Sequence, residues 1–153
     1  MKKFVILLGL VLLMSNTLLA QKLIIGVKAP DLKIKEWITD QQPNSGKPTL
    51  IEFFFSRSEP SCRRLTVMDS FAKKYGDSLN VIVIACEPKE RVLKATEKYI
   101  FAVGLDTDNK TFSAYGAEFV PFGVLLDDKN KVLWFGNSSK FGDKELQAAL
   151  SKK

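Results

Sequence analysis

The sequence contains no histidine, and its only cysteines are Cys62 and Cys86. The lack of histidine excludes His-ligated metal sites and every serine or cysteine nucleophile that depends on a histidine base. One pair of cysteines, 24 positions apart, matches neither a zinc site nor a disulfide framework. We therefore expect no metal and no cofactor, and any thiol chemistry has to come from these two residues.

Long apolar runs are also scarce. The longest covers residues 4–14, which is shorter than the roughly 20 apolar residues that span a bilayer. Two lysines precede this run and the small residue Ala20 follows it, a pattern typical of a secretory signal peptide over residues 1–20. A retained N-terminal anchor is the alternative. We expect an exported, periplasmic protein with one compact domain over residues 21–153 and no membrane span after cleavage.

Charge of one sign is not concentrated anywhere in the chain. There are 23 lysines and arginines against 17 aspartates and glutamates, which gives a formal net charge of +6. The lysines are scattered rather than grouped in blocks or interleaved with aromatic residues, which is typical of a solvated surface. We expect no nucleic-acid partner.

Two continuous apolar stretches, residues 49–55 and 80–86, indicate strands that are buried on both faces. Glu52 is the one interruption of the first stretch. Between the two stretches, residues recur at helical spacing from about Glu59 to Tyr75. The members of this stripe are Ser61, Leu65, Met68, Ala72 and Tyr75. The spacing predicts a helix that joins two parallel strands.

The rest of the sequence predicts further elements of the same domain. Helices are expected over residues 88–99, 110–115 and 143–151, and strands over residues 122–127 and 131–135. The last two strands are joined by a tight turn and form an antiparallel hairpin. The fold class is therefore α/β, with a mixed central sheet and helices on both faces in three layers.

Several short segments occur in an order and spacing that characterise one superfamily. They are Gly26-Val27-Lys28-Ala29-Pro30-Asp31, Gly46-Lys47-Pro48, Tyr115-Gly116, Val120-Pro121 and the hairpin from Leu126 to Gly136. Over nearly all of the domain, the chain resembles the thioredoxin superfamily, specifically its exported TlpA/ResA-type thiol–disulfide oxidoreductases. The resemblance implies a thioredoxin-like fold and a cis bond between Val120 and Pro121. It also implies a groove at this bond for an extended peptide or protein partner.

The signature of that family is a tryptophan followed by Cys-x-x-Cys, at the start of the helix after the first core strand. Matching this strand and helix without a gap places the signature on Ser58-Glu59-Pro60-Ser61, with Arg57 in the tryptophan position. In this register both redox cysteines are serines.

A rival register makes Cys62 the second cysteine and puts Glu59 in place of the first, and it requires a one-residue insertion. Each residue of a helix turns by about 100°, so Cys62 lies a quarter-turn off the apolar stripe on which Ser61 is central. The buried second cysteine of the family should lie on that stripe. We therefore favour the serine register.

The replacement changes the chemistry that the resemblance implies. A cysteine at a helix N-terminus has a lowered pKa and acts as a thiolate nucleophile, and the second cysteine resolves the mixed disulfide. Serine hydroxyls cannot be oxidised in this way, so we interpret Ser58 as a helix cap. The position of Glu52 resembles that of the buried acid that assists the second cysteine of thioredoxins. An ordinary glutamate at the edge of the sheet is the alternative.

Three functions are open at this point. The first, which we favour, is a non-catalytic binding or chaperone-like module that uses the Val120–Pro121 groove. The second is a monothiol oxidoreductase that uses Cys62, alone or with Cys86; the two arginines after Cys62 would favour its thiolate and Glu59 would oppose it. The third is a peroxidase, although the chain shares only the cysteine with the peroxiredoxin motif. We also expect that Cys62 and Cys86 do not form a disulfide.

Overall fold

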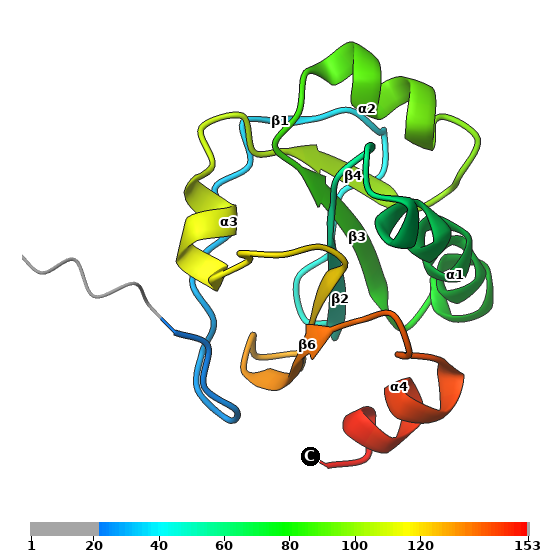
Figure 1. The fold of residues 1–153 in the computed structure, drawn as a ribbon. Coiled ribbons are helices and arrows are strands. Elements are labelled where there is room, and N and C mark those ends of the chain that lie inside the picture. Colours follow the sequence, from blue (N-terminus) through cyan, green and yellow to red (C-terminus); the bar gives the residue numbers. More distant parts are fainter. Residues whose placement is uncertain (1–21, 153) are drawn as a thin grey trace, which may run out of the picture.

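The computed structural model describes residues 22–152 (Figure 1). The expected signal peptide and its cleavage site lie outside these residues. Within them, none of the helices combines the length and the apolar character needed to cross a bilayer.

The centre of the molecule is a six-stranded mixed sheet with the strand order β1-β4-β3-β2-β5-β6. The strands are β1 (Glu36–Trp37), β2 (Thr49–Phe54), β3 (Asn80–Ala85), β4 (Ala102–Leu105), β5 (Phe122–Leu126) and β6 (Val132–Asn137). Strands β2, β3 and β4 are parallel, whereas β1, β5 and β6 run antiparallel to their neighbours. The carboxyl ends of β2 and β3 therefore meet at one edge of the sheet, where ligand sites of α/β folds usually lie.

The helices and an N-terminal segment of the described chain cover the two faces of the sheet (Figure 1). The helices are α1 (Glu59–Tyr75), α2 (Lys89–Thr96), α3 (Lys110–Tyr115) and α4 (Asp143–Leu150). Residues of α1, α2 and α4 contribute to one apolar cluster, and α3 contributes to a second cluster together with residues before β1. The sheet separates the two clusters and gives the three layers that the sequence predicts.

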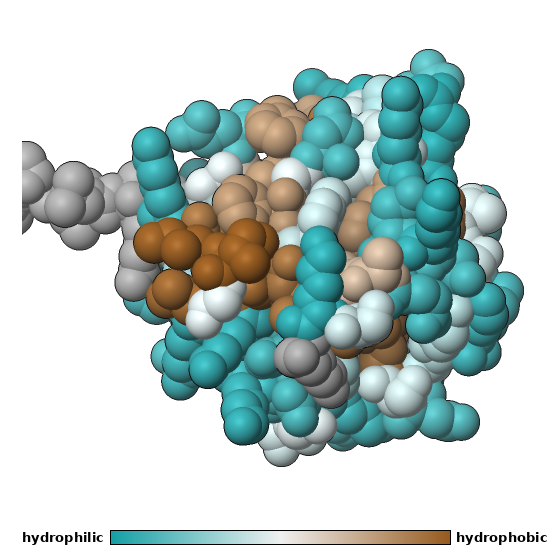
Figure 2. Space-filling model, turned by 90° about the horizontal axis from the view of Figure 1, so that it is seen from below, coloured by the Kyte–Doolittle hydropathy of each residue, from teal (hydrophilic) through white to brown (hydrophobic). Residues whose placement is uncertain are grey.

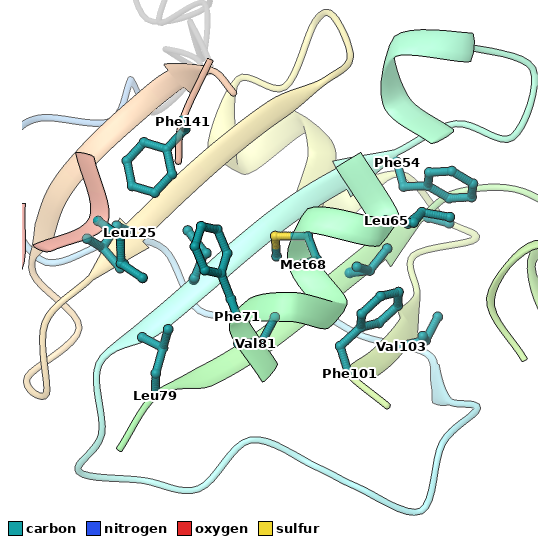
Figure 3. Packing of buried hydrophobic residues seen from close by; sticks show 14 of the residues in the cluster. Phe54, Leu65, Met68, Phe71, Leu79, Val81, Phe101, Val103, Leu125 and Phe141 are labelled. Carbon is teal, nitrogen blue, oxygen red and sulfur yellow. The ribbon is translucent and has the colours of Figure 1, made fainter. Parts of the chain in front are cut away.

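The first cluster joins helix α1 to the sheet. In Figure 3, Met68 and Phe71 of α1 lie against the sheet, with Val81 of β3 close to Phe71. Every residue of β2 and β3 is buried. This explains why both strands appear in the sequence as continuous apolar runs rather than as alternating patterns.

The predicted α/β class is confirmed, and so are the helices over residues 59–75 and 110–115. The helix expected over residues 88–99 is shorter and covers Lys89–Thr96. The hydroxyl of Thr96, its last residue, donates to the carbonyl of Val92 at 2.8 Å, a side-chain bond that competes with continued helical bonding. The expected elements do not include β1 or β4. Strand β1 has only two residues, and β4 contains alanine and glycine, which have low strand propensity.

Candidate functional site at the start of helix α1

Ser58 caps helix α1, as predicted. Its backbone is extended and its Oγ accepts a hydrogen bond from the Ser61 amide at 3.3 Å. Pro60 lies in the first turn, where its missing N–H leaves no hydrogen bond unmade. Glu59 places a carboxylate at the positive end of the helix dipole and pairs with Arg63 one turn later at 2.5 Å. The residue types at this position therefore favour the start of a helix.

Ser61 has no exposed surface, and its Oγ accepts a hydrogen bond from the Phe55 amide at 3.1 Å. Leu65 and Met68 are buried on the same face of α1, whereas Cys62 is only partly buried. The helical periodicity correctly predicts this difference between the two neighbours. The Ser61 hydroxyl thus connects the chain leaving β2 to the first turn of α1.

The thiol of Cys62 lies in an acidic environment. Its Sγ donates to the carbonyl of Ser56 at 3.3 Å. Burial raises the pKa of the Cys62 thiol, and the carboxylates of Glu87 and Glu59 raise it further. Protonated thiols are weak nucleophiles. The surroundings of Cys62 therefore disfavour the thiolate.

The arginines after Cys62 do not offset this effect, contrary to expectation. Arg63 is paired with the exposed carboxylate of Glu59, and Arg64 is buried next to Glu52. Both guanidinium groups are thus engaged with carboxylates rather than available to the thiol.

Sequence reasoning missed Glu87, which organises the loop between β2 and α1. Its side chain is buried, and its two carboxylate oxygens accept hydrogen bonds from the amide and the hydroxyl of Ser56, each at 2.6 Å. Arg91 of α2 lies 3.6 Å from the same carboxylate. The sequence contains one signal for such a role. Glu87 is an acidic residue two positions after a buried strand, at the edge of the sheet where functional sites usually form.

Cys86 is not brought together with Cys62. Cys62 packs against the cluster on the α1 face of the sheet, and Cys86 packs against the cluster on the α3 face. Both thiols are free in the structure. Burial raises the pKa of the Cys86 thiol as well, with smaller contributions from Asp106 and Glu87. The sheet between the two cysteines is the physical reason to expect no disulfide.

Glu52 is fully buried in the middle of β2, so the alternative of an edge glutamate is wrong. Its carboxylate accepts a hydrogen bond from the Ser138 hydroxyl at 2.5 Å and lies 3.4 Å from Nε of Arg64. Arg64 also donates from Nη1 to the carbonyl of Phe141 at 2.9 Å, and its Nη2 has no partner within residues 22–152. Burial raises the pKa of Glu52 to about 7, and Arg64 and Ser138 oppose the rise.

The Val120–Pro121 bond, which the resemblance implies to be cis, has the cis geometry in the structure. Strand β5 begins next to it, with Phe122 paired to Phe53 of β2. The chain at Val120 therefore passes beside the exit of β2. Within the described part of the chain, neither the amide nor the carbonyl of Val120 has a hydrogen-bond partner.

Two exposed aromatic residues adjoin these two segments. Phe55 directly follows β2 and is 36% exposed, and Phe119 precedes Val120 and is 50% exposed. The Phe119 ring packs edge-on against Phe122, with 5.4 Å between the ring centroids. The fold thus presents apolar surface at Phe119 and at Phe55, whose amide bonds to the first turn of α1, together with the unpaired backbone groups of Val120.

No protein-family model matches the chain, and comparison with curated proteins gives no significant match. Solved structures do match it. The thioredoxin domain of a thiol–disulfide oxidoreductase from Bacteroides vulgatus is 17% identical, with a TM-score of 0.70 over 85% of this chain and 97% of that chain. The chain has a thioredoxin-like fold.

Two further thioredoxin-like neighbours support this assignment. A protein assigned as the thiol:disulfide interchange protein DsbE from Chlorobium tepidum is 20% identical, with a TM-score of 0.69 over 83% of this chain and 98% of that chain. StoA from Bacillus subtilis is 22% identical, with a TM-score of 0.54 over 62% of this chain and 76% of that chain. The thioredoxin-like fold is thus found among thiol–disulfide oxidoreductases, whereas the chemistry of this chain depends on its own residues.

Proposed function

We propose that this chain is an exported thioredoxin-like binding module that holds an extended peptide beside the Val120–Pro121 bond and has no dithiol cycle. The observation that carries the proposal is the bonding of the two serines at the start of α1. Ser58 caps the helix and Ser61 accepts the Phe55 amide. In the gapless register these serines take the positions of the two redox cysteines.

The remaining thiol is poorly suited to replace that pair. Cys62 is partly accessible, which is the one observation that favours a monothiol oxidoreductase. Its pKa is raised by burial and by two carboxylates, whereas reactive cysteines usually have a lowered pKa in an electropositive setting. Cys86, on the other face of the sheet, is not placed to resolve a mixed disulfide on Cys62.

Peptide binding needs none of these thiols. An extended peptide can pair its backbone with a free strand-like segment, and apolar pockets then select its side chains. The unpaired amide and carbonyl of Val120 provide such a segment, and Phe55 and Phe119 provide exposed aromatic surface. Aromatic side chains contribute a large share of binding energy at protein interfaces.

The test is binding of a library of fluorescent extended peptides, measured by anisotropy with and without reductant. We expect equal affinity under both conditions and in Cys62→Ser, and an affinity about tenfold lower in Phe119→Ala. Ile100→Ala is the matched control, because Ile100 is 45% exposed and lies after α2, outside the proposed groove. Binding that disappears with reductant or in Cys62→Ser would instead support the monothiol function.

A further inference from the structure

Three aliphatic side chains are exposed in the turn of residues 24–27, near the start of the described chain. Ile24, Ile25 and Val27 are 59%, 57% and 50% exposed, whereas Leu23 and Ala29 on either side are buried. Figure 2, which views the molecule from below, shows apolar side chains gathered on this face with polar ones around them. Isolated exposed aliphatic residues are common, whereas a contiguous group of them on a surface often marks an interaction site.

Hydrogen bonds to β6 hold this turn in place. The Gly26 amide donates to the Val132 carbonyl at 2.8 Å, and the Val132 amide donates back to the Val27 carbonyl at 3.0 Å. The Val27 amide donates to the Ile24 carbonyl at 3.1 Å, and Gly26 has a φ of +81°, which glycine adopts without strain. The exposed side chains are therefore presented by a fixed turn rather than by a loose end.

Lysines surround the aliphatic turn. Lys28 lies directly opposite Lys131 in an antiparallel bridge, and Lys22 precedes the turn. Like charges directly opposite each other across strands are destabilising. None of the three forms an ion pair with another residue in the described range.

Two acidic residues, Asp127 and Asp128, lie in the adjoining hairpin turn, and neither forms an ion pair with these lysines. The carboxylate of Asp127 accepts hydrogen bonds from the amides of Lys129 and Lys131, both at 2.8 Å, so its Oδ1 is directed into the hairpin turn. The arrangement is an aliphatic tip with a basic rim, and an anionic surface would relieve the repulsion between Lys28 and Lys131.

We propose that the Ile24–Val27 turn docks on an anionic phospholipid membrane. Its aliphatic side chains enter the boundary between headgroups and acyl chains, and the surrounding lysines contact lipid phosphates. A second copy of the chain fits less well, because a two-fold contact would place the basic rim against itself.

Co-sedimentation with vesicles tests the proposal. All strands, all helices and both apolar clusters of the described structure lie within residues 22–152, so protein beginning at Gln21 contains the whole described fold. We expect it to bind vesicles that contain phosphatidylglycerol and to bind vesicles of phosphatidylcholine alone much more weakly. Added salt should weaken the binding.

Two double variants separate the apolar and the basic contributions. Ile25→Ser with Val27→Ser should weaken vesicle binding at least about tenfold, and Lys28→Gln with Lys131→Gln should abolish the preference for anionic lipid. Ile100→Ser, at another exposed apolar residue, should bind like the unmodified protein. The proposal is overturned if the turn variants bind as tightly as Ile100→Ser. It is also overturned if the protein does not bind vesicles and instead forms a dimer that the Ile25→Ser/Val27→Ser change disrupts.

Discussion

The Phe55 amide and the Ser61 hydroxyl form a 3.1 Å hydrogen bond that joins the end of β2 to the first turn of α1. Ser61 is completely buried, so this hydroxyl has no access to solvent and serves the backbone of the adjacent loop. A residue that the family resemblance places at a redox position is thus part of the structure of the loop.

We expect Ser61→Ala to lower the free energy of unfolding by about 1–2 kcal/mol, because it removes the acceptor of the Phe55 amide. Ser70→Ala is the matched control in the same helix. Ser70 is exposed, and its hydroxyl only donates to the Thr66 carbonyl at 3.0 Å. Urea unfolding of both variants decides, and equal effects at the two serines would contradict a structural role of Ser61.

Glu52 makes stability depend on pH. Because burial raises its folded-state pKa from 4.5 to about 7, the carboxyl binds its proton more tightly in the folded state than in the unfolded state. Its contribution to stability is fully present below pH 4.5 and is lost as the pH rises to about 7, by at most about 3 kcal/mol.

We therefore expect the stability of the unmodified protein, relative to Glu52→Gln, to fall as the pH rises from about 4.5 to 7. Glu118→Gln is the control for the substitution itself, because Glu118 is exposed and forms no ion pair within the described residues. Denaturant unfolding over this pH range measures the difference. A relative stability that increases with pH would mean that the ion pair with Arg64 outweighs the burial of the carboxylate.

The thiol of Cys62 should react slowly. Because burial, Glu87 and Glu59 all raise its pKa, alkylation by iodoacetamide near neutral pH should be slower than that of a cysteine in an unstructured peptide. Glu59→Gln should accelerate the reaction, since it removes one of the two carboxylates. Mass spectrometry of the alkylated native protein gives the rate, and an alkylation rate equal to that of the peptide would contradict this account.

The same experiment tests the state of both cysteines. We expect Cys62 and Cys86 to be alkylated without prior reduction, because they pack on opposite faces of the sheet. Alkylation that appears only after a reductant is added would show that they are bridged.

The helical spacing of α1 was sufficient to predict that Ser61 is buried and Cys62 is not, because one buried face fixes the phase of a long helix. The buried strands β2 and β3 could be predicted for a similar reason, since a strand covered on both faces is apolar throughout. The contacts of Glu87 with Ser56 and of Glu52 with Arg64 could not be predicted. They join residues on different elements, and only the packing of the elements decides which charges meet.

Restoring the cysteine pair tests directly whether Ser58 and Ser61 occupy the two redox positions. We expect the unmodified protein not to reduce insulin disulfides catalytically, and Ser58→Cys with Ser61→Cys to gain this activity. In that variant the first thiol lies at the start of α1, where the helix dipole lowers its pKa, and the second lies at a buried position one turn later.

The comparison is with Glu59→Cys alone, which creates a Cys-Pro-Ser-Cys sequence that ends at Cys62. Insulin reduction is followed by turbidity for the unmodified protein and both variants under the same conditions. We expect turnover by the double variant only. Turnover by Glu59→Cys but not by the double variant would show that the register is wrong by one residue, and turnover by the unmodified protein that Cys62→Ser abolishes would contradict the absence of thiol chemistry.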